Sequence, residues 1–336
     1  MDKSSYIMSL IFGYKISNAL FIAAENKLFD YLDGKRSVNE IAAQTNTETK
    51  ALAILLNLFA SLELLTCSDG AYDIKEEYRP LLASESGSSY IPLLKMESRL
   101  SEQYANKNVL GSRLIRGAND ITYKAGAKEN QELIYGQTMD NGSRLSSVYV
   151  ARETRHLNGT VLDLGGGIGT YAIQMCKFNQ NIAVHIYDRD EMRAACEENI
   201  RRNKLEGRIQ FIAADVRTCD FKSVYCGALL SNLLHLLNET EMDDLYGKLT
   251  ACLQPHGLVV LHDFFLNQDK TGPEVPVLLT LDWCMLGTFF QMNTGDVRNM
   301  AGRHGLTIVK EQSYASLPTS LIVLRKSPHS GEQRYD

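Results

Sequence analysis

Val161-Leu-Asp-Leu-Gly-Gly-Gly-Ile-Gly-Thr-Tyr-Ala172 is the stretch that decides the fold of this 336-residue chain. The apolar run Thr160–Leu164 predicts a buried strand, and the glycines after it predict a tight turn. Tyr171–Cys176 then has the apolar periodicity of a helix. At such a junction, backbone N–H groups can meet a nucleotide-like ligand with no Cβ in the way. The glycines of Gly165–Gly169 are spaced G-x-G-x-G, whereas a dinucleotide-binding turn has G-x-G-x-x-G.

Two later strands end in carboxylates that belong near this turn. Ala183–Tyr187 is an apolar strand followed by Asp188, at the distance where a ribose-binding carboxylate sits. Ile209–Ala213 is a third strand, and Asp215 after it can accept from an adenine amino group while Val216 packs on the ring. Because the carboxyl ends of parallel strands meet at one edge of a sheet, the three tips predict a nucleoside site.

The composition narrows the class of protein. The length suits two domains, and 44% hydrophobic with 22% charged residues is typical of a globular protein. A net charge of −5 argues against nucleic acid as the main partner. Seven scattered cysteines without a C-x-x-C pair indicate reduced thiols in a cytoplasmic protein. The apolar stretch Ile7–Phe12 is too short to span a membrane and lacks signal-peptide flanks, so no membrane partner is expected.

The first 108 residues have the pattern of a winged-helix domain. Ile16–Leu32 carries apolar residues at helical spacing, and Lys50–Leu65 predicts a second amphipathic helix. Between them, Ser37 and Glu40 form a capping box that starts a short helix. Cys67–Ile74 holds short β-like pieces around a turn, as a wing does.

This N-terminal domain, residues 1–108, could read DNA or pair with a second copy of itself. The charged residues between Ser37 and Leu65 are net acidic, whereas a recognition helix is basic, so DNA binding is disfavoured. The stripe from Ile7 to Leu20 is strongly apolar and precedes any core to which it could belong. It is therefore predicted to form the interface of a homodimer.

Residues 109–336 are predicted to form the second domain. Leu133–Arg155 predicts a helix that leads into the first strand. Strands and helices then alternate, which predicts an α/β fold with a parallel, doubly wound, Rossmann-like sheet. Gly305–Lys310 and Thr319–Leu324 follow as a closing hairpin. The other expected elements are strands at 160–164, 183–187, 208–213, 227–231 and 257–264, and helices at 171–178, 191–204 and 239–252.

His235 and Asp263 are the candidate catalytic residues. His235 follows a strand whose tip faces the crevice, and a neutral histidine can take a proton near pH 7. Asp263 ends the next strand, where it can accept from one ring nitrogen and fix the tautomer. A His235 that only caps the next helix or packs in the core is the alternative. His262 could add a metal site, but strand alternation turns residues 262 and 263 to opposite faces, so no metal is expected.

Taken together, these motifs resemble the class I S-adenosylmethionine-dependent small-molecule O-methyltransferases with an N-terminal winged-helix dimerisation domain. That group includes caffeate-type, acetylserotonin and bacterial antibiotic-tailoring enzymes. The likeness extends over nearly the whole chain. It rests on the glycine stretch, Asp188, Asp215-Val216, Asn232-Leu-Leu-His235, Gly257–Asp263, Tyr135–Ser143 and Leu281–Leu286.

The resemblance implies a role for each matching residue. His235 would be the general base, and Asp263 would support it. Ser143 and Ser231 would lie near the methionine carboxylate of the donor, S-adenosylmethionine, or near neighbouring atoms. The full set of implied donor contacts is Ser143, Asp163, Gly165, Gly167, Asp188, Asp215, Val216 and Ser231. The implied acceptor pocket is Tyr135, Met139, Trp283, Met285 and Phe289, residue types that also occur as ordinary helix core.

The chain departs from this family in three places. The family commonly has His-Asp-Trp where this chain has His235-Leu-Leu237. Many plant members have lysine at the position of Ser231. The stretch Gln291–Asp296 lacks the second glutamate that usually supports the base, and Thr294 is expected in its place.

The predicted function is methyl transfer from S-adenosylmethionine to a hydroxyl of a small aromatic or heteroaromatic secondary metabolite, which leaves S-adenosylhomocysteine. The protein is expected to be a cytoplasmic homodimer. Methylation of nitrogen or carbon stays open, as does a non-methylating decarboxylase or cyclase that keeps the cofactor. A ligand-sensing DNA-binding regulator is a third class.

Overall fold

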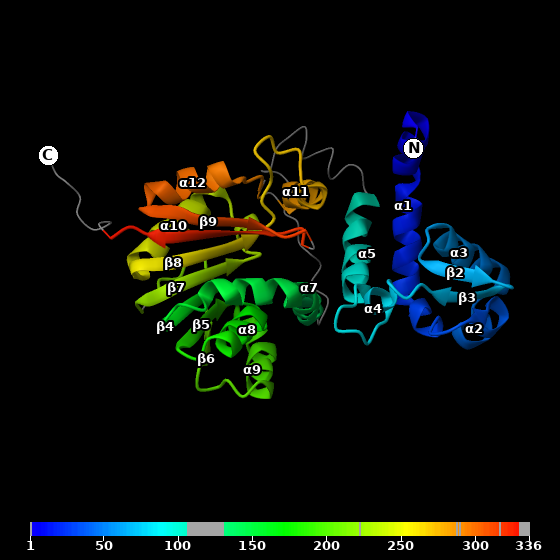
Figure 1. Cartoon of the computed structure of the whole chain (residues 1–336), viewed down its shortest axis with the longest axis horizontal. Coiled ribbons are helices and arrows are strands. Elements are labelled where there is room, and N and C mark those ends of the chain that lie inside the picture. Colours follow the sequence, from blue (N-terminus) through cyan, green and yellow to red (C-terminus); the bar gives the residue numbers. More distant parts are fainter. Residues whose placement is uncertain are drawn as a thin grey trace. The chain divides into compact units, whose positions relative to one another are not determined.

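The computed structural model describes residues 2–105, 131–221, 223–286, 288, 290–315 and 317–328. Side chains are not described at 103, 105, 131–142, 285 and 286. The chain divides into two compact units, residues 1–107 with 137–142 and residues 108–136 with 143–336. Figure 1 labels the helices and strands of both units.

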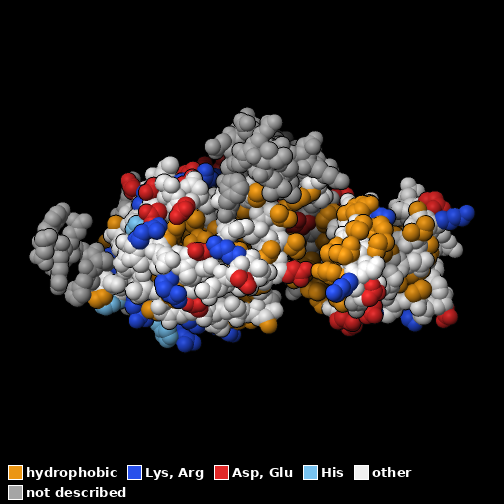
Figure 2. All heavy atoms as spheres, turned by 90° about the horizontal axis from the view of Figure 1, so that it is seen from above, with side chains coloured by type: hydrophobic (Ala, Val, Ile, Leu, Met, Phe, Trp, Pro, Cys, Tyr) orange, Lys and Arg blue, Asp and Glu red, His pale blue; other side chains and the backbone are white. Residues whose placement is uncertain are grey.

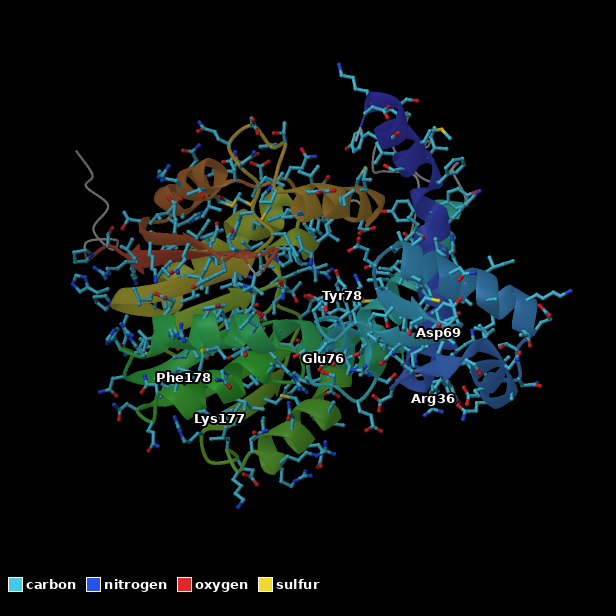
Figure 3. The ribbon with its side chains drawn as sticks, turned by 45° about the vertical axis from the view of Figure 1, so that its right-hand side comes forward. Arg36, Asp69, Glu76, Tyr78, Lys177 and Phe178 are labelled. Atoms are coloured by element: carbon cyan, nitrogen blue, oxygen red, sulfur yellow. The ribbon has the colours of Figure 1, made fainter. Side chains whose placement is uncertain are left out.

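The N-terminal unit is a winged-helix fold, as the sequence predicts. A three-stranded sheet of order β1-β3-β2 packs with the helices around a core in which Leu32, Leu56 and Phe59 are fully buried. β2 and β3 pair antiparallel on either side of a turn that contains Asp69, and they form the wing (Figure 3). In order, the elements are α1 Lys3–Glu25, η1 Leu28–Tyr31, β1 Arg36–Ser37, α2 Val38–Thr45, α3 Thr49–Ser61, β2 Leu65–Ser68, β3 Ala71–Ile74, α4 Arg79–Leu82 and α5 Ile91–Ala105.

Helix α1 starts earlier than the sequence predicts. The expected helix was Ile16–Leu32, but α1 begins at Lys3, capped by the side chain of Asp2, and ends at Glu25. The helix extends well beyond the apolar run Ile7–Phe12, and with 23 residues it is long and apolar enough to cross a membrane by length and composition alone. Only 17% of its most apolar window is buried, and Figure 2 shows hydrophobic side chains gathered on the surface of this unit.

The start of α2 matches the prediction, and the end of α3 does not. The Ser37 side chain accepts from the N–H of Glu40, whose carboxylate accepts from the N–H of Ser37, so the capping box is confirmed. α3 ends at Ser61 instead of Leu65. Glu63 has a φ of 61°, which no helix accommodates, and Leu65 already begins β2.

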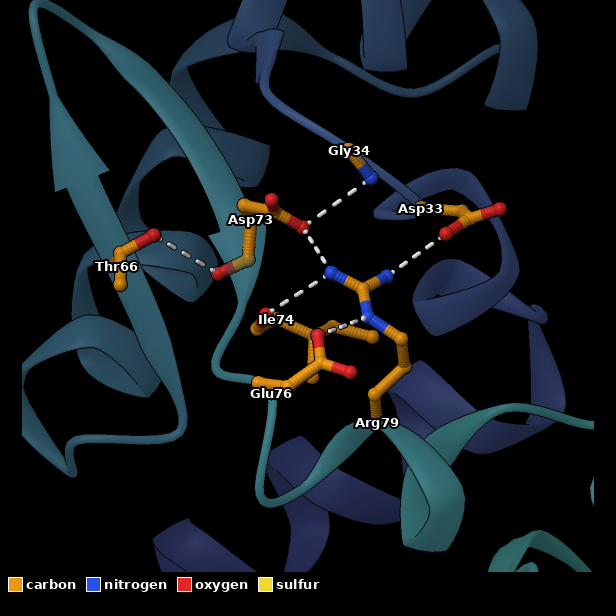
Figure 4. Close-up of polar contacts among 7 residues, drawn as sticks. All are labelled: Asp33, Gly34, Thr66, Asp73, Ile74, Glu76 and Arg79. Carbon is orange, nitrogen blue, oxygen red and sulfur yellow. Dashed lines mark hydrogen bonds and ion pairs between the residues drawn. The ribbon is translucent and has the colours of Figure 1, made fainter.

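Arg79 connects the wing to the loop that follows η1 (Figure 4). Its guanidinium donates to Asp73 Oδ1 and Asp33 Oδ1, each at 2.8 Å, to the carbonyl of Ile74 at 3.2 Å, and to Glu76 at 3.3 Å. The Arg79 side chain is mostly buried, so solvent screens these pairs less than pairs on an open surface. The four contacts fix the position of the wing within the unit.

The C-terminal unit contains a seven-stranded sheet of order β6-β5-β4-β7-β8-β10-β9. The neighbouring strands from β6 to β8 are parallel, but β10 runs antiparallel to both β8 and β9. The sheet is therefore mixed, because the predicted closing hairpin adds its second strand in the reverse direction. The strands are β4 Gly159–Leu164, β5 Ile182–Asp188, β6 Ile209–Ala213, β7 Tyr225–Ser231, β8 Leu253–Asp263, β9 Leu306–Ser313 and β10 Ser320–Lys326.

Helices cover both faces of this sheet (Figure 1). α10, α11 and α12 pack on one core, which includes Leu230 and Leu261. α7, α8 and α9 pack on the other, which includes Val161 and Leu229. The helices are α7 Gln131–Thr154, α8 Thr170–Phe178, α9 Arg193–Arg202, α10 Glu239–Cys252, α11 Glu274–Leu286 and α12 Thr294–Arg303. The sequence prediction missed α12, although Asn293 starts it with a capping box.

Candidate functional site

The glycine turn after β4 has a backbone geometry that favours glycine. Gly165, Gly167 and Gly169 all have positive φ, at 67°, 55° and 84°. A Cβ on Gly167 would meet nothing within 4 Å, so the space beside the turn is open to a ligand. α8 begins directly after the turn, and the first N–H groups of a helix have no partner within the helix. The turn can therefore bind a polar ligand through its backbone.

Carboxylates follow the next two strands, as predicted. Asp188 Oδ2 accepts from the N–H of Gly167 at 2.7 Å. Burial raises the pKa of Asp188, and this hydrogen bond opposes the rise. Asp215 follows β6, is half exposed and accepts from the N–H of Arg217 at 3.0 Å, while Val216 packs against the core. The tips of β6, β5 and β4 thus present two carboxylates and a glycine turn in a row.

Asp163, a predicted donor contact, lies buried beside the glycine turn. It is 1% exposed, and neither carboxylate oxygen has a hydrogen-bond partner among the described residues. Burial, followed by the charge of Asp188, raises the pKa of Asp163 to about 7. A Cβ on Gly166 would lie 2.7 Å from Asp163 Oδ2 and 2.9 Å from Ile186 Cγ2. The sequence analysis missed this glycine because its constraint is space and not spacing.

The structure brings His235 and Asp263 together at the ends of β7 and β8. His235 Nδ1 lies 2.7 Å from Asp263 Oδ1, and the carboxylate also accepts from the N–H groups of Leu234 at 3.0 Å and Phe264 at 2.9 Å. Burial alone would raise the pKa of Asp263, but His235 and these hydrogen bonds hold it below its usual value. The ionised carboxylate accepts from Nδ1–H, which leaves Nε2 as the basic nitrogen. Nε2 has no hydrogen-bond partner in the described part of the chain.

Aromatic rings surround His235. Trp283 of α11 stacks on the imidazole, with 5.0 Å between ring centroids and 24° between planes. Phe264 and Phe290 meet the imidazole edge-on. Thr288 Oγ1 donates to the carbonyl of His235 at 2.8 Å. Thr294, the residue expected to support His235, is the first residue of α12. The other four predicted pocket side chains lie outside the described residues: Tyr135, Met139, Met285 and Phe289.

A buried cluster of polar side chains lies at the end of β7. His262 Nδ1 lies 2.9 Å from Ser231 Oγ and 3.4 Å from Tyr171 Oη, which lies 2.9 Å from Ser146 Oγ. Burial raises the pKa of Tyr171, and the hydroxyls of Ser143, Ser146 and Ser231 oppose the rise. The sequence identified Ser143 and Ser231 but not the residues that connect them, because single hydroxyls on helices carry no pattern.

The described residues fit a nucleoside-containing donor and give no metal site. The open glycine turn, the carboxylate of Asp188 and the half-exposed Asp215 match the three parts expected for such a ligand. No group of three His, Cys, Asp or Glu side chains among the described residues could hold a metal ion. His262 and Asp263 bond to different partners on opposite faces of β8, as strand alternation predicts.

Two known protein families match the chain. The O-methyltransferase dimerisation domain matches residues 8–83, and a methyltransferase domain matches residues 161–257. The first match falls on the winged-helix unit, and the second runs from the glycine stretch into β8. The matches therefore cover both parts of the predicted resemblance.

Known enzymes are similar over most of their length. L-tyrosine C(3)-methyltransferase of Streptomyces lavendulae is 24% identical over 80% of this chain and 77% of its own. 3-hydroxy-5-methyl-1-naphthoate 3-O-methyltransferase of Streptomyces sahachiroi is 23% identical over 86% of this chain and 85% of its own. The structure of human N-acetylserotonin methyltransferase in complex with S-adenosylmethionine is 21% identical, with a TM-score of 0.82 over 97% of this chain and 99% of that chain. This structural likeness shows the fold.

Proposed function

This chain belongs to the S-adenosylmethionine-dependent O-methyltransferases with an N-terminal dimerisation domain, and we propose that it methylates a hydroxyl oxygen of a small aromatic or heteroaromatic molecule, with His235 as the general base. One observation carries this proposal. His235 Nδ1 is held 2.7 Å from Asp263 Oδ1, and Nε2 has no partner among the described residues. A histidine in this state is suited to accept a proton.

The proposed reaction needs a positioned oxygen and a base. Bound S-adenosylmethionine supplies a methyl group on a sulfonium sulfur that is already a good leaving group. The chain must hold the acceptor hydroxyl in line with that methyl group. His235 Nε2 takes the hydroxyl proton as the O–C bond forms, and the C–S electron pair stays on sulfur. Asp263 stabilises the resulting imidazolium, which loses its proton to solvent when the product leaves.

The rings around His235 support an aromatic acceptor. Trp283, Phe264 and Phe290 surround the imidazole, so a flat apolar molecule can continue this packing. The naphthoate-methylating relative, by its name, acts on a molecule of this kind. An aliphatic alcohol would gain less from such contacts.

Methylation of carbon is the second candidate, since one relative is an L-tyrosine C(3)-methyltransferase. Removal of a phenolic proton also activates the neighbouring ring carbon, so the same base would serve both reactions. Methylation of nitrogen would need no base at an already uncharged amine. A non-methylating enzyme on this fold would alter its substrate without adding a methyl group.

The test is transfer of a 13C-labelled methyl group to a panel of phenols, heteroaromatic hydroxyls and amines. The chemical shift of the new carbon signal distinguishes O-methyl, N-methyl and C-methyl products. We expect an O-methyl signal from at least one aromatic hydroxyl. A label only on carbon or nitrogen, or an altered substrate without label, would overturn the assignment to oxygen.

We further propose a cytoplasmic homodimer that forms through the N-terminal unit, with neither nucleic acid nor a membrane as partner. The family match to a dimerisation domain supports this, as do the exposed apolar side chains of α1, among them Leu10 and Tyr14. The acidic wing residue Asp69 disfavours contact with DNA phosphates (Figure 3). A membrane would compete for the same helix, so insertion of α1 is the outcome that would contradict the dimer.

A further inference from the structure

One assignment of protons satisfies the hydrogen bonds of the buried polar cluster at the end of β7. Ser146 Oγ donates its one proton to the carbonyl of Ser143 at 3.0 Å. The Tyr171 hydroxyl, 2.9 Å from Ser146 Oγ, must therefore donate to Ser146. Because that donation uses the tyrosine proton, Tyr171 can only accept from His262 Nδ1 at 3.4 Å. It follows that His262 carries its proton on Nδ1.

This tautomer determines the state of Ser231. The Nδ1–H of His262 also faces Ser231 Oγ at 2.9 Å, so Ser231 accepts this bond. The proton of Ser231 itself then points away from His262, toward the Tyr171 hydroxyl or toward a ligand. Burial lowers the pKa of His262 to about 4, so the ring is neutral near pH 7. The Ser231 hydroxyl can thus donate its proton to a ligand.

The strand order shows which part of the methyl donor meets Ser231. Of the carboxylates expected to hold adenine and ribose, Asp215 follows β6 and Asp188 is the last residue of β5. In the order β6-β5-β4-β7, a donor with its nucleoside over the first two tips extends its amino-acid end across β4 toward β7. Ser231 is the last residue of β7, beside the turn that follows β4. That end of the donor carries a carboxylate, to which the Ser231 hydroxyl can donate its proton.

We propose that His262 is a positioning residue that holds Ser231 as an acceptor, so that the Ser231 hydroxyl donates to the amino-acid carboxylate of S-adenosylmethionine. His262 acts through Ser231 and touches neither the donor nor the acceptor. The inference rests on the proposed function only for the identity of the donor. It is independent of the acceptor and of His235.

The test compares two ligands that differ in this carboxylate. S-adenosylhomocysteine has the amino-acid end, and 5′-methylthioadenosine lacks it. Isothermal titration of the full chain measures the affinity for each. His262→Phe keeps a planar ring but removes the Nδ1–H donor. We expect this variant to bind S-adenosylhomocysteine about tenfold more weakly than wild type, since one charge-assisted hydrogen bond is lost. Its affinity for methylthioadenosine should stay within about twofold of the wild-type value.

Three further variants separate positioning from packing. His262→Asn returns an N–H donor near the place of Nδ1 and should recover most of the lost affinity. Ser231→Ala should lower the affinity for S-adenosylhomocysteine as much as His262→Phe does. The double variant should bind it no more weakly than either single variant, because both changes remove the same bond. His185→Phe is the matched control. Its Nδ1 lies 3.2 Å from Tyr225 Oη in the interior of β5, so binding of both ligands should stay unchanged.

The outcomes distinguish this role from the proposed function. Equal weakening of both ligands by His262→Phe would show that the residue only packs, and would overturn the proposal. An unchanged affinity for S-adenosylhomocysteine would overturn it as well. If the wild-type chain bound no S-adenosylhomocysteine, the assignment of S-adenosylmethionine as the methyl donor would be overturned. Normal binding without methyl transfer would contradict only the role of His235.

Discussion

Two buried aspartates in the C-terminal unit differ in charge state because their neighbours differ. Asp263 accepts hydrogen bonds from His235 and two backbone N–H groups, and these contacts hold its pKa low despite burial. Asp163 has no such partner among the described residues, and burial raises its pKa to about 7. The first is a permanent anion that can orient a base. Asp163 ionises only near neutral pH.

Asp163 should make the stability of the free protein fall as pH rises. Its folded pKa of about 7 lies above the ordinary aspartate value of 3.8, so between these two pH values the folded state holds a proton that the unfolded state has lost. The resulting loss of unfolding free energy is absent below about pH 4. It grows between about pH 4 and pH 7, by at most about 1.4 kcal/mol per pH unit, and is constant at higher pH.

Asp163→Asn removes this dependence. The gain in unfolding free energy of the variant over wild type should increase between pH 5 and pH 8, as measured by chemical denaturation. Asparagine also buries polar atoms, so the change with pH is the test and not the absolute value. Asp215→Asn, at an exposed aspartate, is the control. A difference between Asp163→Asn and wild type that does not vary with pH would contradict the account.

The glycine turn is the element on which donor binding is expected to depend, and Gly166 is its position with the least space for a Cβ. An alanine Cβ there would lie 2.7 Å from a carboxylate oxygen of Asp163, so the turn must shift. We expect Gly166→Ala to lower the affinity for S-adenosylhomocysteine by at least about tenfold, because the backbone N–H groups of the turn lose their positions. Titration calorimetry measures the loss.

Gly207→Ala is the matched control for Gly166→Ala. Gly207 lies between α9 and β6, and a Cβ there would meet nothing within 4 Å. Its affinity for S-adenosylhomocysteine should equal that of wild type. If Gly166→Ala bound as tightly as Gly207→Ala, the turn would not be the rigid element described here.

The sequence predicts elements well where one segment carries the signal. The capping box of Ser37, the wing, and α10 with its bounds Glu239–Cys252 are local patterns, and the structure has all three. The predicted start of α1 was wrong because the apolar side chains of its first half belong to no core within the described N-terminal unit, whereas Ala19, Ala23 and Ala24 near its end do. The direction of β10 could not be read from alternating strands and helices, because pairing with β8 is a long-range contact.

The residues of the candidate site also differ in whether a local sequence pattern identifies them. His235, Asp263 and Asp188 were predictable because each lies at or just after the carboxyl end of a strand, and the ends of parallel strands converge. The cluster of Tyr171 and His262 was not, since it joins a helix to a strand far along the chain. The predicted boundary between residues 108 and 109 lies outside the described residues, so it stays a prediction.

At the scale of the whole molecule, we expect the exposed apolar side of α1 to form the dimer interface. Leu10 is 59% exposed and stands among other exposed apolar side chains of the helix. We expect wild type to be a dimer in light scattering and Leu10→Asp to be a monomer, because a buried unpaired charge opposes association. Ile54→Asp, on α3, replaces a side chain that is 73% exposed and should leave the dimer intact. A monomeric wild type, or a dimeric Leu10→Asp, would contradict this interface.

The measurement that tests the central claim is the single-turnover rate of methyl transfer to an accepted phenol by wild type and His235→Asn. Asparagine can still donate to Asp263 but has no basic nitrogen, so the buried carboxylate keeps a partner. We predict a rate lower by about 10²–10⁴-fold, the usual contribution of a general base. The affinity for S-adenosylhomocysteine should be unchanged, and the loss should be smaller for a more acidic phenol. A His235→Asn rate close to that of wild type on the less acidic phenol would contradict base catalysis by His235.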